Sequence, residues 1–148
     1  MGISRTCEAC GQKVTIRHES MSKGLVDTLL TFADAVRREG RNKIHLQKEV
    51  NLTKNQYNNF QKLRYHGLVY KVKDQPGYWL LTRNGGSFLR NELAIPKEVF
   101  VFNNHIVEKG HKLVRISEFY KTSFDEDYWQ RNFSASIFAG YNGQESLF

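Results

Sequence analysis

The amino-acid sequence predicts an α+β fold, and three observations support this prediction. Apolar residues recur at helical spacing after residue 23 and again after residue 52. Two β-rich runs, residues 68–73 and 78–82, are separated by a turn-forming segment. After residue 96, two further runs alternate between apolar and polar residues, as β-strands do. Helices combined with antiparallel hairpins in one short chain are typical of an α+β architecture.

Length and composition limit the classes of protein to consider. A chain of 148 residues can hold one ordinary core, and 40% hydrophobic with 13% aromatic residues indicates a folded protein. No apolar run approaches the roughly 20 residues of a membrane span, and the N-terminus has no apolar signal region. Two cysteines offer no disulfide framework. A cytoplasmic protein without a membrane partner is expected. Its organisation is predicted as four segments: an N-terminal turn unit (1–21), a main domain (22–95), a hairpin and helical extension (96–133) and a tail (134–148).

The main domain is expected to begin with two helices. The first starts at Lys23 and ends at Gly40, with an apolar stripe of Leu25, Leu29, Phe32, Ala33 and Val36. A short second helix spans Ile44 to Val50. Residues 51–53 then make a tight turn into a third helix.

The third helix, between Leu52 and Leu68, carries its own start and stop signals. Thr53 and Gln56 form a capping box, and Gly67 stands where a helix ends in a left-handed residue. At 100° per residue, one side holds Tyr57, Phe60, Leu63 and Arg64. The opposite, outward side holds Lys54, Asn55, Asn58, Gln61, Lys62 and Tyr65. This outward side is polar, as on any solvated helix.

Next come a hairpin and a closing helix. Residues 74–77, Asp-Gln-Pro-Gly, form the hairpin turn, and Lys71 and Lys73 point together to one side. Thr82 caps the closing helix, in which Phe88, Leu89 and Leu93 face the core.

Charge supports a nucleic-acid interface on the third helix and the hairpin. Between residues 37 and 73, ten basic residues face two acidic ones, which leaves +8, whereas the whole chain carries +7. Amide side chains pair with adenine edges, and lysines reach guanine or phosphate. The expected contacts to double-stranded DNA are Lys54, Asn55, Asn58, Asn59, Lys62, Tyr65, Arg41, Lys43, Lys71 and Lys73.

This order of elements resembles the winged helix-turn-helix family. The resemblance rests on the capped third helix and on the segment from Gly77 through Phe88 and Leu89, and it covers about half the chain. It implies a reading helix in the major groove and a hairpin wing against the backbone. The same fold also serves protein-binding roles.

After Pro96 a second hairpin is predicted. Val99 to Val107 alternates like a strand, residues 108–110 turn, and Lys112 to Ile116 returns. A short helix is expected between Asp125 and Phe133.

The N-terminal Cys7-Glu8-Ala9-Cys10-Gly11 resembles a zinc knuckle, and zinc is the predicted cofactor. Two cysteines are half of a tetrahedral site. The remaining ligands are either His105 and His111, on one face of the second hairpin, or His18, or the cysteines of a second chain. The alternatives are a degenerate knuckle or a free dithiol. A thioredoxin-type role is disfavoured, because no βαβ pattern surrounds the pair.

The C-terminal residues Gln144-Glu145-Ser146-Leu147-Phe148 resemble the pentapeptide by which bacterial replication proteins dock on the sliding clamp. Gln144, Ser146, Leu147 and Phe148 match that pattern, whereas Glu145 departs from its usual apolar second residue. The alternative is that these residues pack on the protein's own core. Docking of the tail would be a peptide-in-pocket contact.

The sequence thus predicts a non-enzymatic DNA-binding protein, either a transcription regulator or a replication-linked accessory factor. No nucleophile, phosphate loop or supported carboxylate pair is found. The compact combination is similar to proteins of phages and mobile elements. The rival hypothesis is an inhibitor or adaptor of phage origin that binds a host nucleic-acid-processing or defence complex. The oligomeric state is left open.

Overall fold

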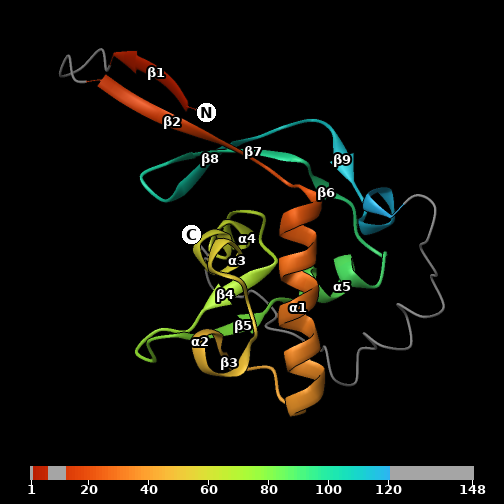
Figure 1. Cartoon of the computed structure of the whole chain (residues 1–148). Helices are drawn as coiled ribbons and strands as arrows, with labels where there is room; N and C mark the ends of the chain where they lie inside the picture. The colour runs from red at the N-terminus through yellow and green to blue at the C-terminus, as the bar shows by residue number, and fades with distance from the viewer. Residues whose placement is uncertain (1, 7–12, 121–148) are drawn as a thin grey trace.

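The computed structural model describes residues 2–6 and 13–120 (Figure 1). The described part is mixed α and β with antiparallel sheets, in agreement with the predicted α+β class. Its elements, in chain order, are β1 (Gly2–Thr6), β2 (Lys13–Ser20), α1 (Lys23–Glu39), β3 (Ile44–His45), α2 (Leu46–Glu49), α3 (Lys54–Asn59), α4 (Lys62–Tyr65), β4 (Val69–Lys71), β5 (Tyr78–Leu81), α5 (Arg83–Leu89), β6 (Ile95–Pro96), β7 (Glu98–Phe102), β8 (His105–Lys109), β9 (Leu113–Val114) and the 3₁₀ helix η1 (Ile116–Phe119).

Three sheets organise these strands. The strand orders are β1-β2-β7-β8, β3-β5-β4 and β6-β9, and every pairing is antiparallel. Helix α1 stands beside the second sheet, and the first sheet crosses above α3 and α4 in the view of Figure 1.

Helix α1 forms where the apolar stripe predicts it. The Ser22 hydroxyl accepts a hydrogen bond from the Leu25 amide, and Gly40 ends the helix with φ of 68°. The predicted stripe is buried in the main core. This helix is the scaffold on which α3, α4 and η1 pack.

The third helix is correctly placed but is divided. The capping box of Thr53 and Gln56 is present, and Gly67 adopts φ of 76°. However, α3 ends at Asn59 and α4 begins at Lys62, so two short segments replace one continuous helix. Upstream, the segment expected as one short helix begins with β3, which pairs with β5.

The predicted hairpin and closing helix are confirmed. Strands β4 and β5 pair, and Asp74 in the connecting turn has φ of 63°. The Thr82 hydroxyl accepts from the Gly85 amide at 2.9 Å and donates to the Gly67 carbonyl at 2.6 Å. Helix α5 ends at Leu89, so Leu93 lies beyond it, although Leu93 still packs against the core.

The N-terminal strands belong to the same sheet as the extension. Strand β2 pairs with β7 from Arg17↔Val101 to Ser20↔Glu98. Segments 1–21 and 96–133, which the sequence treats as separate, therefore share one sheet. The pairing joins residues about eighty positions apart, which no local pattern specifies.

The predicted turn of the second hairpin is wrong. The chain reverses at Asn103 and Asn104, whose φ angles are 53° and 65°, and Phe102 pairs with His105. Two residues with positive φ form the hairpin turn that matches strand twist, and asparagine tolerates that conformation. Residues 108 and 109 consequently lie within β8.

The first sheet rests on the end of α4 through a small apolar cluster. Tyr65, Val99 and Val101 are buried together, with Ile106 packed against them. This cluster is distinct from the main core that surrounds α1. It fixes the β7–β8 hairpin beside the predicted reading helix.

Candidate nucleic-acid interface

The outward face of α3 carries exposed polar side chains, as predicted. Lys54, Asn55 and Asn58 are exposed. The Asn59 amide donates to the Asn55 carbonyl at 2.9 Å and to the Asn55 side-chain oxygen at 3.2 Å, so Asn59 is occupied within the helix. Lys54 and Asn58 are therefore the freest candidates for contacts to a duplex.

Lys62 lies on a different side of the helix pair from Lys54. Its ammonium lies 3.7 Å from Glu19 Oε1, and the other carboxylate oxygen, Glu19 Oε2, lies 3.6 Å from Arg17 Nη1. The Glu19 side chain is only 11% exposed, so this carboxylate needs a positive partner. Lys62 supplies this positive charge together with Arg17, so Lys62 is not a free phosphate contact and its predicted role is weakened.

A polar groove lies between the start of α1 and the helix pair α3–α4, and its lining includes Lys62, Asn55 and Asn59. The groove has a volume of ≈ 400 Å³, and Glu19 and Asp27 bring carboxylates into it. A duplex phosphate is disfavoured there, since both carboxylates would repel it. The reading face of α3 is therefore narrower than helical spacing indicates.

Tyr65 is a clear correction. The sequence places it on the outward face, but its side chain is only 2% exposed. Its hydroxyl accepts from Arg17 Nη2 at 3.1 Å and donates to Asn104 Oδ1 at 3.1 Å. The angular position is that of an outward residue, and the β7–β8 hairpin covers it.

Tyr57 departs from prediction in the opposite sense. It is expected on the buried side but is 45% exposed. It borders a shallow hollow of ≈ 230 Å³ that is lined by α2, α3 and the loop between them. An aromatic side chain in this position can contact a sugar or a base as readily as a protein.

The β4–β5 hairpin presents the two predicted lysines. Lys71 and Lys73 are exposed, and Lys71 pairs in register with Trp79, which itself pairs with Ile44. Residues paired across strands share a face. Lys71 thus lies on the face that packs on the helices, and Figure 1 shows this hairpin and α3 on the same side of α1.

Lys54, Lys71 and Lys73 have no acidic partner within the described residues. Each of the ion pairs found there involves other basic residues. These three residues are named here the open lysines. Unpaired, exposed ammonium groups can release counterions on binding phosphate.

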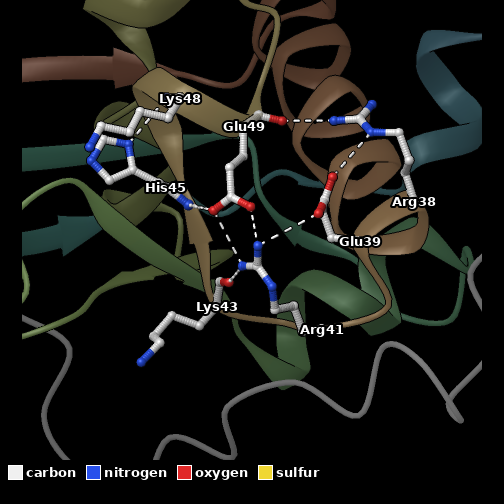
Figure 2. A network of polar contacts seen from close by, with 7 residues as sticks. All are labelled: Arg38, Glu39, Arg41, Lys43, His45, Lys48 and Glu49. Atoms are coloured by element: carbon white, nitrogen blue, oxygen red, sulfur yellow. Dashed lines mark hydrogen bonds and ion pairs between the residues drawn. The ribbon is translucent and has the colours of Figure 1, made fainter.

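Arg41 is engaged in a network of its own, shown in Figure 2. Its guanidinium bridges both carboxylate oxygens of Glu49 and donates to the Lys43 carbonyl. The Arg41 hydrogen bond, followed by that of the His45 amide, lowers the pKa of Glu49. Arg41 therefore fixes the β3–α2 corner, and its charge is compensated.

Two lysines of this corner remain directed to solvent. The Lys43 ammonium lies 5.7 Å from the centre of the Tyr78 ring and is exposed. Lys48 is exposed on α2, where its amide donates to His45 Nδ1 at 3.1 Å. Lys43 keeps its predicted place in the candidate interface, and Lys48 joins it although the sequence pattern did not select it.

The structure separates the two histidines of the predicted metal site. His105 begins β8, and His111 follows the end of the same strand, so the two do not face each other across a hairpin. His18 Nε2 lies 2.6 Å from a Glu98 carboxylate oxygen. Within residues 2–6 and 13–120 no group of three or more potential metal ligands occurs. Cys7 and Cys10 lie outside the described residues, so zinc stays a prediction.

The predicted clamp-binding residues Gln144, Ser146, Leu147 and Phe148 also lie outside the described residues. Their docking on a sliding clamp stays a prediction. In the part of the chain that is described, no helix is long and apolar enough to cross a membrane.

Comparison with known proteins gives no homologue from which function could be transferred. No family model matches the chain, and searches of curated proteins and of solved structures give no significant match. Function must therefore be argued from the geometry above.

Proposed function

We propose that this chain is a non-enzymatic winged-helix protein that binds double-stranded DNA through α3 and the β4–β5 hairpin. The succession α1-β3-α2-α3/α4-β4-β5, with strand order β3-β5-β4, supports the fold assignment. In that fold α3 is the reading helix and the β4–β5 hairpin is the wing.

The observation that carries the proposal is the set of open lysines on α3 and on the β4–β5 hairpin. Lys54 begins α3, and Lys71 and Lys73 belong to the β4–β5 hairpin, which lies on the same side of α1 as α3 (Figure 1). Asn58, which is exposed on the same helix as Lys54, carries an amide that can pair with a base edge. In protein–DNA complexes, positive groups contact phosphates and position the protein, whereas side chains such as amides contact base edges and specify the sequence. The open lysines and Asn58 provide groups of both kinds.

Salt dependence tests this proposal. The double variant Lys71→Gln with Lys73→Gln should bind a random-sequence duplex of about 20 base pairs more weakly. The slope of log affinity against log salt should fall by about 0.9 for each phosphate that the variant no longer neutralises. Fluorescence anisotropy across a salt series measures both quantities.

The matched control is Lys112→Gln, which removes an exposed lysine between β8 and β9. Its slope should equal that of the wild type. Wild-type protein without salt-dependent duplex binding would overturn the DNA proposal and favour the inhibitor or adaptor function. An unchanged slope in the double variant would remove the wing from the interface.

Two expectations accompany the proposal for residues outside the described ranges. The tail from Gln144 to Phe148 is proposed to dock on a bacterial sliding clamp, which would link DNA binding to replication. Cys7 and Cys10 are proposed to contribute to a zinc site. Clamp pull-down with and without the tail, and elemental analysis of Cys7→Ser, test them independently.

A further inference from the structure

The β7–β8 hairpin lies against α4, the short helix that follows the proposed reading helix α3, and on the opposite side of these helices from the β4–β5 hairpin (Figure 1). Its turn consists of Asn103 and Asn104, and the side-chain oxygen of Asn104 accepts a hydrogen bond from the Tyr65 hydroxyl of α4. Its strands pack on Tyr65 through Val99 and Val101. Figure 1 shows the tips of this hairpin and of the β4–β5 hairpin on the same side of α1, with α3 and α4 between them.

The tip of this hairpin exposes several side chains that can contact a nucleic acid. Phe102 is 38% exposed, and Asn103, Asn104 and His105 are exposed beside it. Amide and imidazole groups offer donors and acceptors to bases and phosphates. An exposed aromatic ring offers a face for a sugar or an unstacked base.

A bulge directs the tip. Phe100 pairs with Glu108 and Val101 pairs with Ile106, so Val107 is an extra residue on β8. A bulge bends its strand and increases the local twist, and bulges commonly re-aim side chains near functional sites. Together with the Tyr65 hydrogen bond, it gives the tip a defined position relative to the helix.

From this juxtaposition we infer that the β7–β8 tip is a second wing, which contacts the same duplex on the flank opposite the β4–β5 hairpin. The inference rests on the proposed function. Asn103 and His105 supply polar contacts to the backbone or groove edge, and Phe102 supplies apolar contact. The Arg17–Tyr65–Asn104 chain of hydrogen bonds, 3.1 Å at each link, is the positioning element.

Photo-cross-linking tests the inference on the full chain. The photoreactive residue p-benzoylphenylalanine replaces His105, Lys71 or Lys112 in three separate proteins. Each is irradiated with a labelled random-sequence duplex of about 30 base pairs, long enough for three helical turns. Lys112 is the matched control, because it is exposed and follows the opposite end of β8.

The second wing predicts cross-links from His105 and Lys71 and none from Lys112. Cross-links from Lys71 alone overturn the second wing and leave the proposed function standing. Absence of cross-links from both His105 and Lys71 overturns the second wing and the proposed function together. Equal cross-linking from Lys112 shows unspecific contact and also overturns the second wing.

A charge variant gives an independent readout. Asn103→Asp with His105→Glu changes only exposed residues, and aspartate tolerates the positive φ of position 103. Negative groups against phosphates should weaken duplex binding by about threefold or more at constant salt. The control Lys112→Glu changes the net charge by the same amount and should not weaken duplex binding. Equal affinities of the two variants for the duplex would contradict the inference. Thermal unfolding of both proteins checks that folding is retained.

Discussion

Removal of one oxygen atom, from the side chain of Tyr65, tests how the first sheet is fixed to α4. In Tyr65→Phe the ring still fills the cluster with Val99 and Val101, and only the hydroxyl and its two hydrogen bonds are removed. The Arg17 side chain is 47% exposed and Asn104 is exposed, so both partners can turn to water. Neither partner is therefore left buried and unsatisfied by the substitution.

The magnitude follows from that exposure. The net contribution of one hydrogen bond to the free energy of unfolding is about 0.5–1.5 kcal/mol. Because both partners of the Tyr65 hydroxyl can bond to water instead, the loss for each bond should be at the lower end of this range. The free energy of unfolding should fall by about 1 kcal/mol, equivalent to roughly 2–4 °C in Tm for a chain of this size. Urea unfolding followed by circular dichroism measures the change.

A double-mutant cycle isolates the link to the hairpin tip. Asn104→Gly removes the amide and keeps the positive φ. With Tyr65→Phe, the cycle should give a coupling free energy of about 0.5 kcal/mol. Tyr57→Phe is the control, because Tyr57 is exposed and outside this contact. Strict additivity of the two changes would show that the Tyr65–Asn104 bond does not fix the tip.

Three further predictions concern the free energy of unfolding, measured by urea titration. Gly85→Ala should lower it by about 2 kcal/mol or more, since a Cβ there would lie 2.2 Å from the Leu68 carbonyl oxygen. Gly24→Ala is the control and should be neutral or stabilising, because its Cβ would meet only Ser22 Oγ at 3.8 Å. Thr53→Ala should lower the free energy of unfolding by about 1 kcal/mol through loss of the capping box, whereas Thr53→Ser should retain most of it. Burial lowers the pKa of His66 from 6.5 to about 4, although the Pro96 carbonyl opposes the shift. Between those pH values the unfolded chain binds a proton that the folded chain does not. The free energy of unfolding should therefore fall by about 3 kcal/mol in all as the pH is lowered through this range. His66→Phe should flatten this part of the pH profile of urea unfolding.

Features encoded by neighbouring residues are predicted well. The Thr53 capping box, the Gly67 helix end and the Thr82 cap each depend on residues within four positions, and all three are present. The β4–β5 hairpin likewise follows from its turn residues. Local hydrogen bonding and backbone preference decide these features, so a sequence pattern suffices.

Features decided by distant contacts are not predicted. Tyr65 lies on the outward side by helical angle, but Asn104, 39 positions later, comes to cover it. Likewise, Glu19 precedes α1, and its partner Lys62 lies on α4. In both cases tertiary contacts change the environment of a side chain without changing its helical position. One local signal does mark the observed turn: two consecutive asparagines at 103 and 104 match a two-residue turn better than residues 108–110 do.

The length of α3 gives the inferred second wing its physical importance. Six residues span about 9 Å at 1.5 Å per residue, which covers roughly three base pairs. Asn59 at the end of α3 and Lys62 at the start of α4 are engaged in contacts within the protein, so the helix pair offers few free groups. A protein that makes about six to ten phosphate contacts binds duplex DNA with a steep salt dependence. In a single copy, the second wing would add contacts from the flank of α3 opposite the β4–β5 hairpin, whereas in a dimer a second copy would supply the additional contacts. The stoichiometry of the complex with a short duplex, measured by analytical ultracentrifugation, therefore separates a two-winged monomer from a dimer.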